Sequence, residues 1–326
     1  MALVGDWRVM IGLGAILPVV LIVLVLWVLP ESPRWLVARD RVDEARPILT
    51  QIYPPGYDVD PVIQDIQEAL EREQQSQMGW KLLLKPSPAM KRMLLVGIGT
   101  AVSQQGVGID AIQYYLVDVL EESGISNDQK RNFVLILLGL IKLAFIVVGG
   151  KLFDKAGRRP LFFVSLIGVA VSMLVVGFAF VIDESQSTAF IVTGLGVYLA
   201  FFSIAMGPGA WLIPSEVFAT SVRGKAMSMA TLLNRAAATL MASTFLSTAN
   251  AIGWGGFFLL LSAAAVVILG FLYVYLPETK GRSLEDMSIY FAELTGDDSL
   301  LEAERKIVEQ RDAPATELTS PTKEVI

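Results

Sequence analysis

The sequence predicts an all-α membrane protein, and its composition and the length of its apolar segments carry that prediction. Of the 326 residues, 54% are hydrophobic and only 18% are charged, which is more apolar sequence than an ordinary soluble core absorbs. Seven apolar segments are long enough to cross ~30 Å of hydrocarbon as helices that rise ~1.5 Å per residue. These segments are residues 9–29, 93–120, 133–153, 161–182, 189–213, 226–249 and 255–276.

The composition also excludes several kinds of active site. The chain contains no cysteine and no histidine, which rules out disulfide bonds, thiol catalysis, histidine triads and imidazole proton relays. We therefore expect no enzyme, no catalytic residue, no metal site and no cofactor. The net charge of −6 comes mostly from one polar loop and the tail, so it indicates no charged partner, and no nucleic-acid-binding signature is present.

Basic side chains in the short connections predict the orientation of the spans. They follow the first, third, fifth and seventh segments, which places these four connections in the cytosol and the N-terminus outside. Lys130 and Arg131 are a minor exception on the outer side. The basic residues assigned to the cytosol are Arg34, Arg39, Arg41, Lys155, Arg158, Arg159, Arg223, Lys225, Lys280 and Arg282.

Polar stretches divide the chain into four parts. We expect residues 1–32 to form one transmembrane helix and residues 93–282 to form six more. Residues 33–92 are too charged for the membrane, and Ile63, Ile66 and Leu70 recur at helical spacing, which predicts amphipathic helices on the cytosolic face. Residues 283–326 form a cytosolic tail whose last part has the composition of a disordered segment.

The second span carries more polar side chains than contact with lipid would tolerate. Residues 103–115 include Gln104, Gln105, Asp110 and the two glycines Gly106 and Gly108. Two glycines within three residues loosen a helix, and freed backbone groups at membrane depth survive only where they are buried or line a cavity. We therefore predict that this stretch faces a substrate site.

Three charged residues interrupt the predicted spans, namely Asp110, Lys142 and Arg235. Counting ~1.5 Å per residue from the cytosolic charges places Lys142 and Arg235 ~18 Å deep, near the midplane. One alternative is that each charge is a structural tether, or that the long cations snorkel to the interface. Because intramembrane charges are costly and usually mark a substrate or ion path, we predict a charge network that lines a water-accessible cavity.

Acids and arginines recur together at the predicted cytosolic ends of the spans. For any single motif, the alternative that these charges only set the topology of the spans is as good an explanation as a structural role. Their recurrence favours a charge latch, in which acids and arginines bind each other in one conformation of the protein and separate in another. The predicted latch residues are Glu31, Arg34, Asp154, Arg158, Arg159, Glu216, Arg223 and Glu278.

Six motifs in order resemble those of the sugar porter family of the major facilitator superfamily. Together they cover roughly residues 7–287. The motifs are Pro30-Glu31-Ser32-Pro33-Arg34, Gln104-Gln105 with Gly108 and Tyr114-Tyr115, Asp154 with Gly157-Arg158-Arg159, Gly207-Pro208 with Trp211, Ser215-Glu216-Val217-Phe218 with Arg223-Gly224, and Pro277-Glu278-Thr279-Lys280-Gly281.

Four positions make the resemblance more specific. Many hexose facilitators have Asn at the positions of Asp110 and Lys142, Glu at that of Ser203 and Trp at that of Arg235, whereas plant-type polyol and monosaccharide proton symporters resemble this sequence at all four. The resemblance implies a proton-coupled carrier of a neutral polyol, cyclitol or monosaccharide in a lipid bilayer. It also implies sugar contacts, which suit amide, carboxylate and indole groups, at Gln104, Gln105, Asp110, Trp211 and Asn234.

The resemblance covers only part of a full sugar porter, which has twelve spans in two six-helix halves. The motifs here match the sixth to the twelfth span, so we expect a fragment or truncated product in the plasma or vacuolar membrane. By resemblance, a proton-binding carboxylate and half of the substrate wall belong to the first five spans. Two other hypotheses stay open: an organic anion or phosphate transporter, which suits two midplane cations, and a non-transporting membrane partner or sugar sensor.

Overall fold

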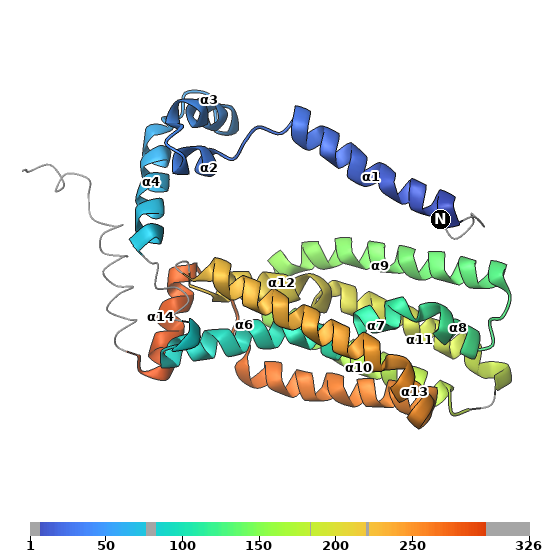
Figure 1. Ribbon diagram of the computed structural model, residues 1–326. Helices are drawn as coiled ribbons and strands as arrows, with labels where there is room; N and C mark the ends of the chain where they lie inside the picture. The colour runs from blue at the N-terminus through green and yellow to red at the C-terminus, as the bar shows by residue number, and fades with distance from the viewer. Residues whose placement is uncertain (1–6, 76–82, 183, 220–221, 298–326) are drawn as a thin grey trace, which may run out of the picture. The chain divides into compact units, whose positions relative to one another are not determined.

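A computed structural model describes residues 7–75, 83–182, 184–219 and 222–297 (Figure 1). Every regular element in these ranges is a helix. The chain divides into two compact units, Met1–Trp80 and Lys81–Ile326. The predicted disordered end of the tail lies outside the described residues.

The first unit contains one apolar helix followed by three short ones. Helix α1 is Trp7–Trp27, and it is followed by α2 (Pro33–Ala38), α3 (Val42–Ile52) and α4 (Asp60–Gln75). Helices α2 to α4 enclose a small core that includes Leu36, Leu49 and Ile63. An ion pair of 2.5 Å between Arg46 Nη1 and Asp60 Oδ1 joins α3 to the start of α4.

The second unit is a helical bundle. Its elements are α6 (Pro88–Gly106), α7 (Ile109–Tyr114), α8 (Leu116–Glu122), α9 (Asp128–Ala156), α10 (Arg158–Ala179), α11 (Glu184–Ile204), α12 (Met206–Val217), α13 (Arg223–Tyr275) and α14 (Leu284–Thr295). Helix α13 bends at Gly253, where φ is 77° and ψ is 155°, so its 53 residues form two helical segments. Helix α10 packs on both α11 and α13, and α6 packs on α12, α13 and α14.

Four helical stretches of the described residues are long and apolar enough to cross a membrane, namely Asp128–Phe153, Arg158–Ala179, Ser187–Val217 and Arg223–Tyr275, and Ile11–Trp27 is a shorter apolar helix. The last of the four contains the sixth and seventh predicted spans, which meet at the bend. The second predicted span is broken into α6, α7 and α8. The apolar segments predicted from the sequence therefore all correspond to helices, although two of them are interrupted.

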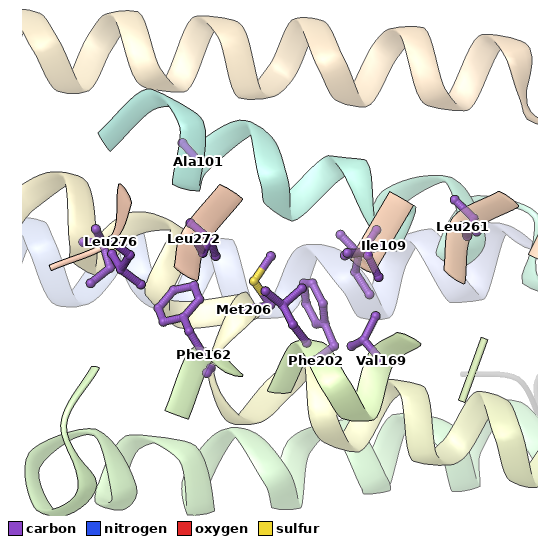
Figure 2. Packing of buried hydrophobic residues seen from close by; sticks show 14 of the residues in the cluster. Ala101, Ile109, Phe162, Val169, Phe202, Met206, Leu261, Leu272 and Leu276 are labelled. Carbon is purple, nitrogen blue, oxygen red and sulfur yellow. The ribbon is translucent and has the colours of Figure 1, made fainter. Parts of the chain in front are cut away.

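The buried core of the second unit follows the length of the bundle. Figure 2 shows part of it, where Met206 and Val169 lie near Ile109, and Phe162 lies near Leu272. In lipid the hydrophobic effect between helices is absent, so close van der Waals packing has to hold such a bundle together. The interior is correspondingly tight: Phe162 and Met206 have no exposed surface.

The break between α6 and α7 leaves backbone groups within the predicted substrate segment without hydrogen bonds inside the helix. Gly108 has a φ of +80°, a left-handed conformation that glycine adopts without steric cost. The interruption frees the carbonyl of Val107, and the buried hydroxyl of Tyr198 on α11 donates a hydrogen bond of 3.0 Å to it. The break is therefore held in place from a neighbouring span, as buried irregular backbone in a membrane requires.

A second break separates α11 from α12 at Ala205, where φ is −137° and ψ is −51°. Ser165 on α10 stabilises it, because its hydroxyl donates to Phe201 O at 2.6 Å and accepts from Met206 N at 3.4 Å. Residues 189–213 were predicted to form one continuous span, and this break was not predicted. Gly207 and Pro208 follow Ala205 within three residues and are a local signal for such an interruption.

Two adjacent glycines on α9 provide a test of the packing at this second break. A Cβ added at Gly149 would lie 2.9 Å from Ile204 Cα and closer still to its carbonyl oxygen, whereas one added at Gly150 would meet nothing within 4 Å. We expect Gly149→Ala to destabilise the protein by about 1–3 kcal/mol through overpacking and Gly150→Ala to be neutral or slightly stabilising. Thermal unfolding in detergent measures both, and equal effects would contradict the close helix contact.

Candidate functional site

Polar side chains from separate spans converge on one cavity in the second unit. The cavity has a volume of about 360 Å³. Helices α6, α7, α9, α11, α12 and α13 each contribute at least one residue to its wall. The lining residues are Gln104, Ile109, Asp110, Gln113, Lys142, Ile146, Phe202, Ser203, Gly207, Pro208, Trp211 and Arg235.

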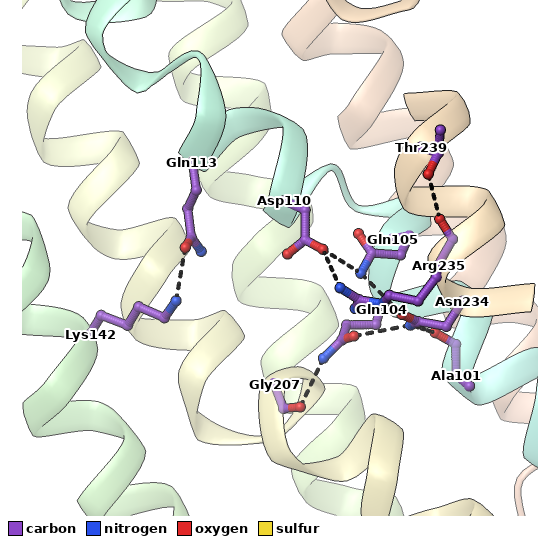
Figure 3. A network of polar contacts seen from close by, with 10 residues as sticks. All are labelled: Ala101, Gln104, Gln105, Asp110, Gln113, Lys142, Gly207, Asn234, Arg235 and Thr239. Atoms are coloured by element: carbon purple, nitrogen blue, oxygen red, sulfur yellow. Dashed lines mark hydrogen bonds and ion pairs between the residues drawn. The ribbon is translucent and has the colours of Figure 1, made fainter. Parts of the chain in front are cut away.

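Gln104 is held from two sides at the end of α6 (Figure 3). Its Nε2 donates to the carbonyl of Gly207 on α12 at 2.9 Å. Its Oε1 accepts from Asn234 Nδ2 on α13 at 3.1 Å. An amide has two donor hydrogens and two lone pairs, so Gln104 keeps one donor and one acceptor for a ligand in the cavity.

Asp110 and Arg235 form an ion pair across the cavity wall. The distance from Arg235 Nη1 to Asp110 Oδ2 is 3.2 Å. Gln105 Nε2 donates to the same carboxylate oxygen at 3.0 Å. The guanidinium of Arg235 also lies over the ring of Trp211, 5.9 Å from the ring centroid, which is within the range of a cation–π interaction. Together these contacts fix an acid, a cation and an indole beside one another.

Lys142 occupies a different part of the wall. Its Nζ donates to Gln113 Oε1 on α7 at 3.1 Å (Figure 3). Within the described residues it forms no ion pair. The structure thus divides the predicted network into two parts, the pair of Asp110 with Arg235 and the lysine with its amide partner.

Ser203, which entered the family resemblance but was not among the predicted site residues, also lines the cavity. It is 1% exposed, and its hydroxyl has no hydrogen-bond partner among the described residues. A serine in an apolar helix usually bonds to the carbonyl four residues earlier and has only a structural role. The position of Ser203 on the cavity wall is what makes it a candidate for contact with a solute. Ile146 and Phe202 were not predicted, because nothing in the sequence marks which face of a span meets the cavity. Gln113 lies within the stretch 103–115 that was predicted to face a substrate site, and it does line the cavity.

The five predicted sugar contacts fall into two groups. Gln104, Asp110 and Trp211 line the cavity. Gln105 and Asn234 lie outside the set of lining residues and are almost completely buried, at 1% and 0% exposure. The structure therefore brings all five close together, with three at the cavity surface and two behind it. The described residues contain no group of acids that could hold a metal ion.

A second polar site joins three helix ends at the predicted cytosolic side. Arg158, at the start of α10, binds Glu216 of α12 through Nη2 at 2.8 Å and Nε at 3.2 Å. Its Nη1 donates to Phe153 O at 3.0 Å. Thr279, which follows α13, donates its hydroxyl hydrogen to Glu216. We call Arg158, Glu216, Glu278 and Thr279 the charge cluster.

Glu278 accepts hydrogen bonds from the backbone at the start of α10. Partial burial raises the pKa of this carboxyl, but hydrogen bonds from the backbone N–H groups of Lys280, Arg158 and Arg159 outweigh burial and hold the pKa below its ordinary value of 4.5. A carboxyl with a lowered pKa in the folded state stabilises the protein at neutral pH. That stabilisation is lost as the pH falls from the ordinary value through the lowered one.

Two further predicted latch residues of this unit have described side chains, Arg159 and Arg223, and among the described residues neither forms an ion pair with the charge cluster. Arg159 donates through Nη2 to Tyr273 O at 2.8 Å, and Arg223 Nε is buried with no hydrogen-bond partner in the part of the chain that the structure describes. Glu31 accepts from Ser32 N at 2.9 Å. It belongs with Arg34 to the first unit, and the side chain of Asp154 lies outside the described residues.

Comparisons with known proteins cover most of the chain. The profile of the family described as "Sugar (and other) transporter" matches residues 2–291. Probable polyol transporter 4 of Arabidopsis thaliana is 37% identical over 290 residues, which are 88% of this chain and 55% of the relative. Facilitated trehalose transporter Tret1 of Aedes aegypti is 32% identical over 291 residues, which are 86% of this chain and 35% of the relative. The chain therefore spans about half of the length of the polyol transporter.

Solved structures agree with the predicted architecture. The proton:xylose symporter XylE bound to 6-bromo-6-deoxy-D-glucose aligns with a TM-score of 0.68 at 27% identity, over 84% of this chain and 57% of that chain. The inward open conformation of the xylose transporter XylE from E. coli aligns with a TM-score of 0.67 at 26% identity, over 89% of this chain and 60% of that chain. The predicted all-α membrane fold is confirmed.

Proposed function

Since the chain belongs to the sugar (and other) transporter family, we propose that it forms part of a membrane carrier for a neutral monosaccharide, polyol or cyclitol. The predicted family is thereby confirmed, and the named relatives are transporters rather than enzymes. The observation that carries the proposal is the convergence of Gln104, Asp110, Trp211 and Arg235 from four helices on one cavity.

The chemistry of the cavity suits a solute with many hydroxyl groups. Gln104 offers one amide donor and one acceptor, and Asp110 offers carboxylate oxygens that accept from hydroxyl groups. Trp211 provides an apolar face for the C–H surface of a sugar and an N–H donor. A site built to bond each hydroxyl discriminates strongly against solutes that lack one, because its own polar groups then stay unpaired.

The two helix breaks support transport by alternating access. Carriers bind their cargo near the bilayer midplane at interrupted helices, and one half of the carrier rocks against the other. Here α6 and α7 break at residues 107–108 and α11 and α12 break at residue 205, and both breaks adjoin cavity residues. We assign residues 93–282 to the C-terminal six-helix half, residues 1–32 to the span before it, residues 33–92 to a cytosolic linker and residues 283–326 to a cytosolic tail.

Proton coupling is the second part of the proposal. Asp110 is a carboxylate within a predicted span, and it sits beside the cation of Arg235. Protonation of such a group changes the charge of the cavity, which provides a means of linking a proton to the bound solute. We place the carrier in the plasma or vacuolar membrane.

Lys142 favours a second candidate function. Its ammonium group faces the cavity and, among the described residues, pairs with an amide rather than a carboxylate. An ammonium group that is bonded to an amide and forms no ion pair among the described residues suits an organic anion or phosphate as cargo. Competition by excess gluconate or phosphate against a labelled polyol separates the two candidates, because the anion carrier would prefer the anionic competitor.

The first test replaces a cavity amide. We expect Gln104→Ala to weaken binding of the preferred solute at least tenfold, because the change also leaves Gly207 O and Asn234 Nδ2 without their partner. Equilibrium binding of labelled sorbitol, xylitol, myo-inositol, glucose and xylose to purified protein in lipid nanodiscs measures the change. Gln129→Ala, which removes an exposed glutamine from α9, is the matched control.

The same preparation distinguishes carrier from sensor. Flux into liposomes that accompanies binding supports transport by this chain. Binding without flux supports the third hypothesis, a non-transporting partner or sugar sensor. Unchanged affinity in the Gln104→Ala variant would contradict the proposed site in either case.

A further inference from the structure

A second cavity lies at the predicted outer end of the second unit and shares no lining residue with the solute cavity. It has a volume of about 610 Å³, and its wall is formed by residues 124–127, 129–130, 133–134 and 188. These residues belong to the loop after α8, the first turns of α9 and the start of α11, which meet at one end of the bundle (Figure 1). We call it the outer cavity. We propose that it binds a phospholipid, with the lipid phosphate at Lys130 and an acyl chain along α9.

The wall of the outer cavity is held in place by bonds within the protein. The hydroxyl of Thr188 on α11 donates to Ser123 O, which joins the loop after α8 to a neighbouring span. Ile125 N donates to Leu120 O at 3.0 Å, and the Ile125 side chain is 9% exposed and packs into the core. A wall that is already ordered loses little freedom when a ligand binds, which favours affinity.

Lys130 is the charged side chain in the wall of the outer cavity. It is exposed and forms no ion pair in the part of the chain that the structure describes. The neighbouring Arg131 differs, because it pairs with Asp128 Oδ1 at 2.5 Å and with Glu121, so both acids are occupied. A lone exposed lysine is common on protein surfaces, and its place in this cavity is what makes Lys130 a candidate for binding an anion.

Asn127 supplies a second donor beside Lys130. Its Oδ1 accepts from the backbone N–H groups of Gln129 at 2.9 Å and Lys130 at 3.1 Å, which caps α9 and fixes the orientation of the amide. Its Nδ2 donates no hydrogen bond within the described residues, so both of its hydrogens remain for a ligand. An ammonium group and an oriented amide donor suit the oxygens of a phosphate.

Lys130 lies at the level expected for lipid head groups. Counted from Asp154 at the predicted cytosolic end of α9, it lies ~36 Å along the helix, just beyond the ~30 Å of hydrocarbon. The predicted span begins at Phe133, ~4.5 Å deeper along the same helix. The outer cavity therefore lies across the boundary between head groups and hydrocarbon.

An apolar strip continues from the outer cavity along α9. Phe133, Leu137 and Leu140 follow Lys130 at the spacing of one helix face, and they are 67%, 41% and 58% exposed. A soluble phosphate would contact only the polar end of this surface. A phospholipid matches both parts, because its phosphate meets the two donors while an acyl chain covers the strip. We therefore assign the cavity to a lipid rather than to a soluble anion.

Native mass spectrometry of the whole chain in detergent tests the role of Lys130. We expect the wild-type protein to retain phosphatidylglycerol in preference to monogalactosyldiacylglycerol, which has similar acyl chains but no phosphate. Lys130→Gln should lower the bound fraction of phosphatidylglycerol about fivefold. Lys151→Gln, which removes an exposed lysine of the same helix outside the cavity, is the matched control and should retain the lipid.

Two results of that experiment would overturn the proposal. Equal losses in Lys130→Gln and Lys151→Gln would show that the lipid responds only to the total charge of the protein. Displacement of the lipid by excess glycerol 3-phosphate would show that a soluble phosphate is sufficient to occupy the site.

Asn127→Asp separates lipid binding from the structural role of the cap. Aspartate caps a helix as well as asparagine does, so we expect thermal unfolding without added lipid to stay unchanged. The variant loses the two Nδ2 hydrogens and places a carboxylate beside Lys130, so retention of phosphatidylglycerol should fall about fivefold. Retention equal to that of the wild-type protein would contradict the assigned phosphate position.

Cross-linking locates the lipid on the surface of the bundle. We expect phosphatidylglycerol with a photoreactive diazirine in one acyl chain to label residues 133–140 of α9 in nanodiscs, and Lys130→Gln to reduce that labelling. Val164, Ile167 and Val171 of α10 are exposed to a similar degree, at 51%, 51% and 53%, and serve as the reference for lipid that contacts the protein at random. Equal labelling of α9 and α10 would overturn the proposal. No transported solute is present, so the result is independent of the proposed carrier function.

Discussion

Arg235→Leu is expected to lower the stability of the protein by about 1–2 kcal/mol, because it removes a charge-assisted hydrogen bond from the cavity wall. The side chain of Arg235 is 51% exposed, so the larger cost of breaking a fully buried ion pair does not apply. In the wild-type protein, Arg235 Nη1 lies 3.2 Å from Asp110 Oδ2. The change also removes two donors from Asn234 Oδ1. Unfolding in mixed detergent and SDS measures the loss.

A double variant identifies the cause of that loss. In Asp110→Asn with Arg235→Leu the unpaired carboxylate is gone, so we expect the part of the loss that comes from the ion pair to return, while the part that comes from Asn234 Oδ1 remains and solute binding stays weak. Arg41→Leu removes an arginine from an exposed ion pair with Glu44 and serves as the control, with little change expected. If the single Arg235 variant is as stable as the wild type, the ion pair is not a structural element of the cavity.

Glu216→Gln is expected to cost about 2 kcal/mol, since it replaces a charge-assisted pair with a neutral hydrogen bond. Glu216 receives hydrogen bonds from Arg158 and from Thr279, and the side chains of Arg158 and Glu216 are only 14% and 22% exposed. Because these residues come from three helix ends, the change loosens α10, α12 and the segment after α13 from one another. The midpoint of thermal unfolding in detergent measures the effect.

Two further variants give this prediction its controls. Arg158→Lys keeps the charge but loses the fork that binds both carboxylate oxygens, so it should destabilise the protein almost as much. Glu293→Gln changes an exposed acid on α14 and should have little effect. Equal midpoints for Glu216→Gln and Glu293→Gln would show that the charge cluster does not hold the helix ends together.

Local sequence patterns were sufficient for the spans and for one of the two helix breaks. Apolar length determines where a helix can cross lipid, and Gly106 with Gly108 indicated the interruption after α6. The break at Ala205 was missed although Gly207 and Pro208 follow it and Pro208 has no N–H group to bond the carbonyl of Ile204. The residue that stabilises the break, Ser165, lies 40 positions earlier in the sequence, and a partner so distant leaves no local pattern.

The site was predictable in composition and less so in arrangement. Polar residues at membrane depth identified Gln104, Asp110, Lys142 and Arg235, since lipid does not tolerate them. Whether Asn234 faces the cavity or supports it depends on its rotation about α13 and on partners in α6. These are properties of packing, and the sequence of one span does not contain them.

The most direct test of the central claim is the water accessibility of the cavity. The sequence contains no cysteine, so a single introduced cysteine is the only thiol that a reagent can label. Ile146 and Val148 on the same helix are equally exposed, at 43% each, but only Ile146 lines the cavity. We expect a charged, membrane-impermeant thiol reagent, present on both sides of nanodiscs, to label the Ile146→Cys variant, and a bound polyol to slow that labelling, while Val148→Cys stays unreactive. Equal labelling of the two variants, or labelling of Ile146→Cys that no polyol slows, would contradict a solute-binding cavity.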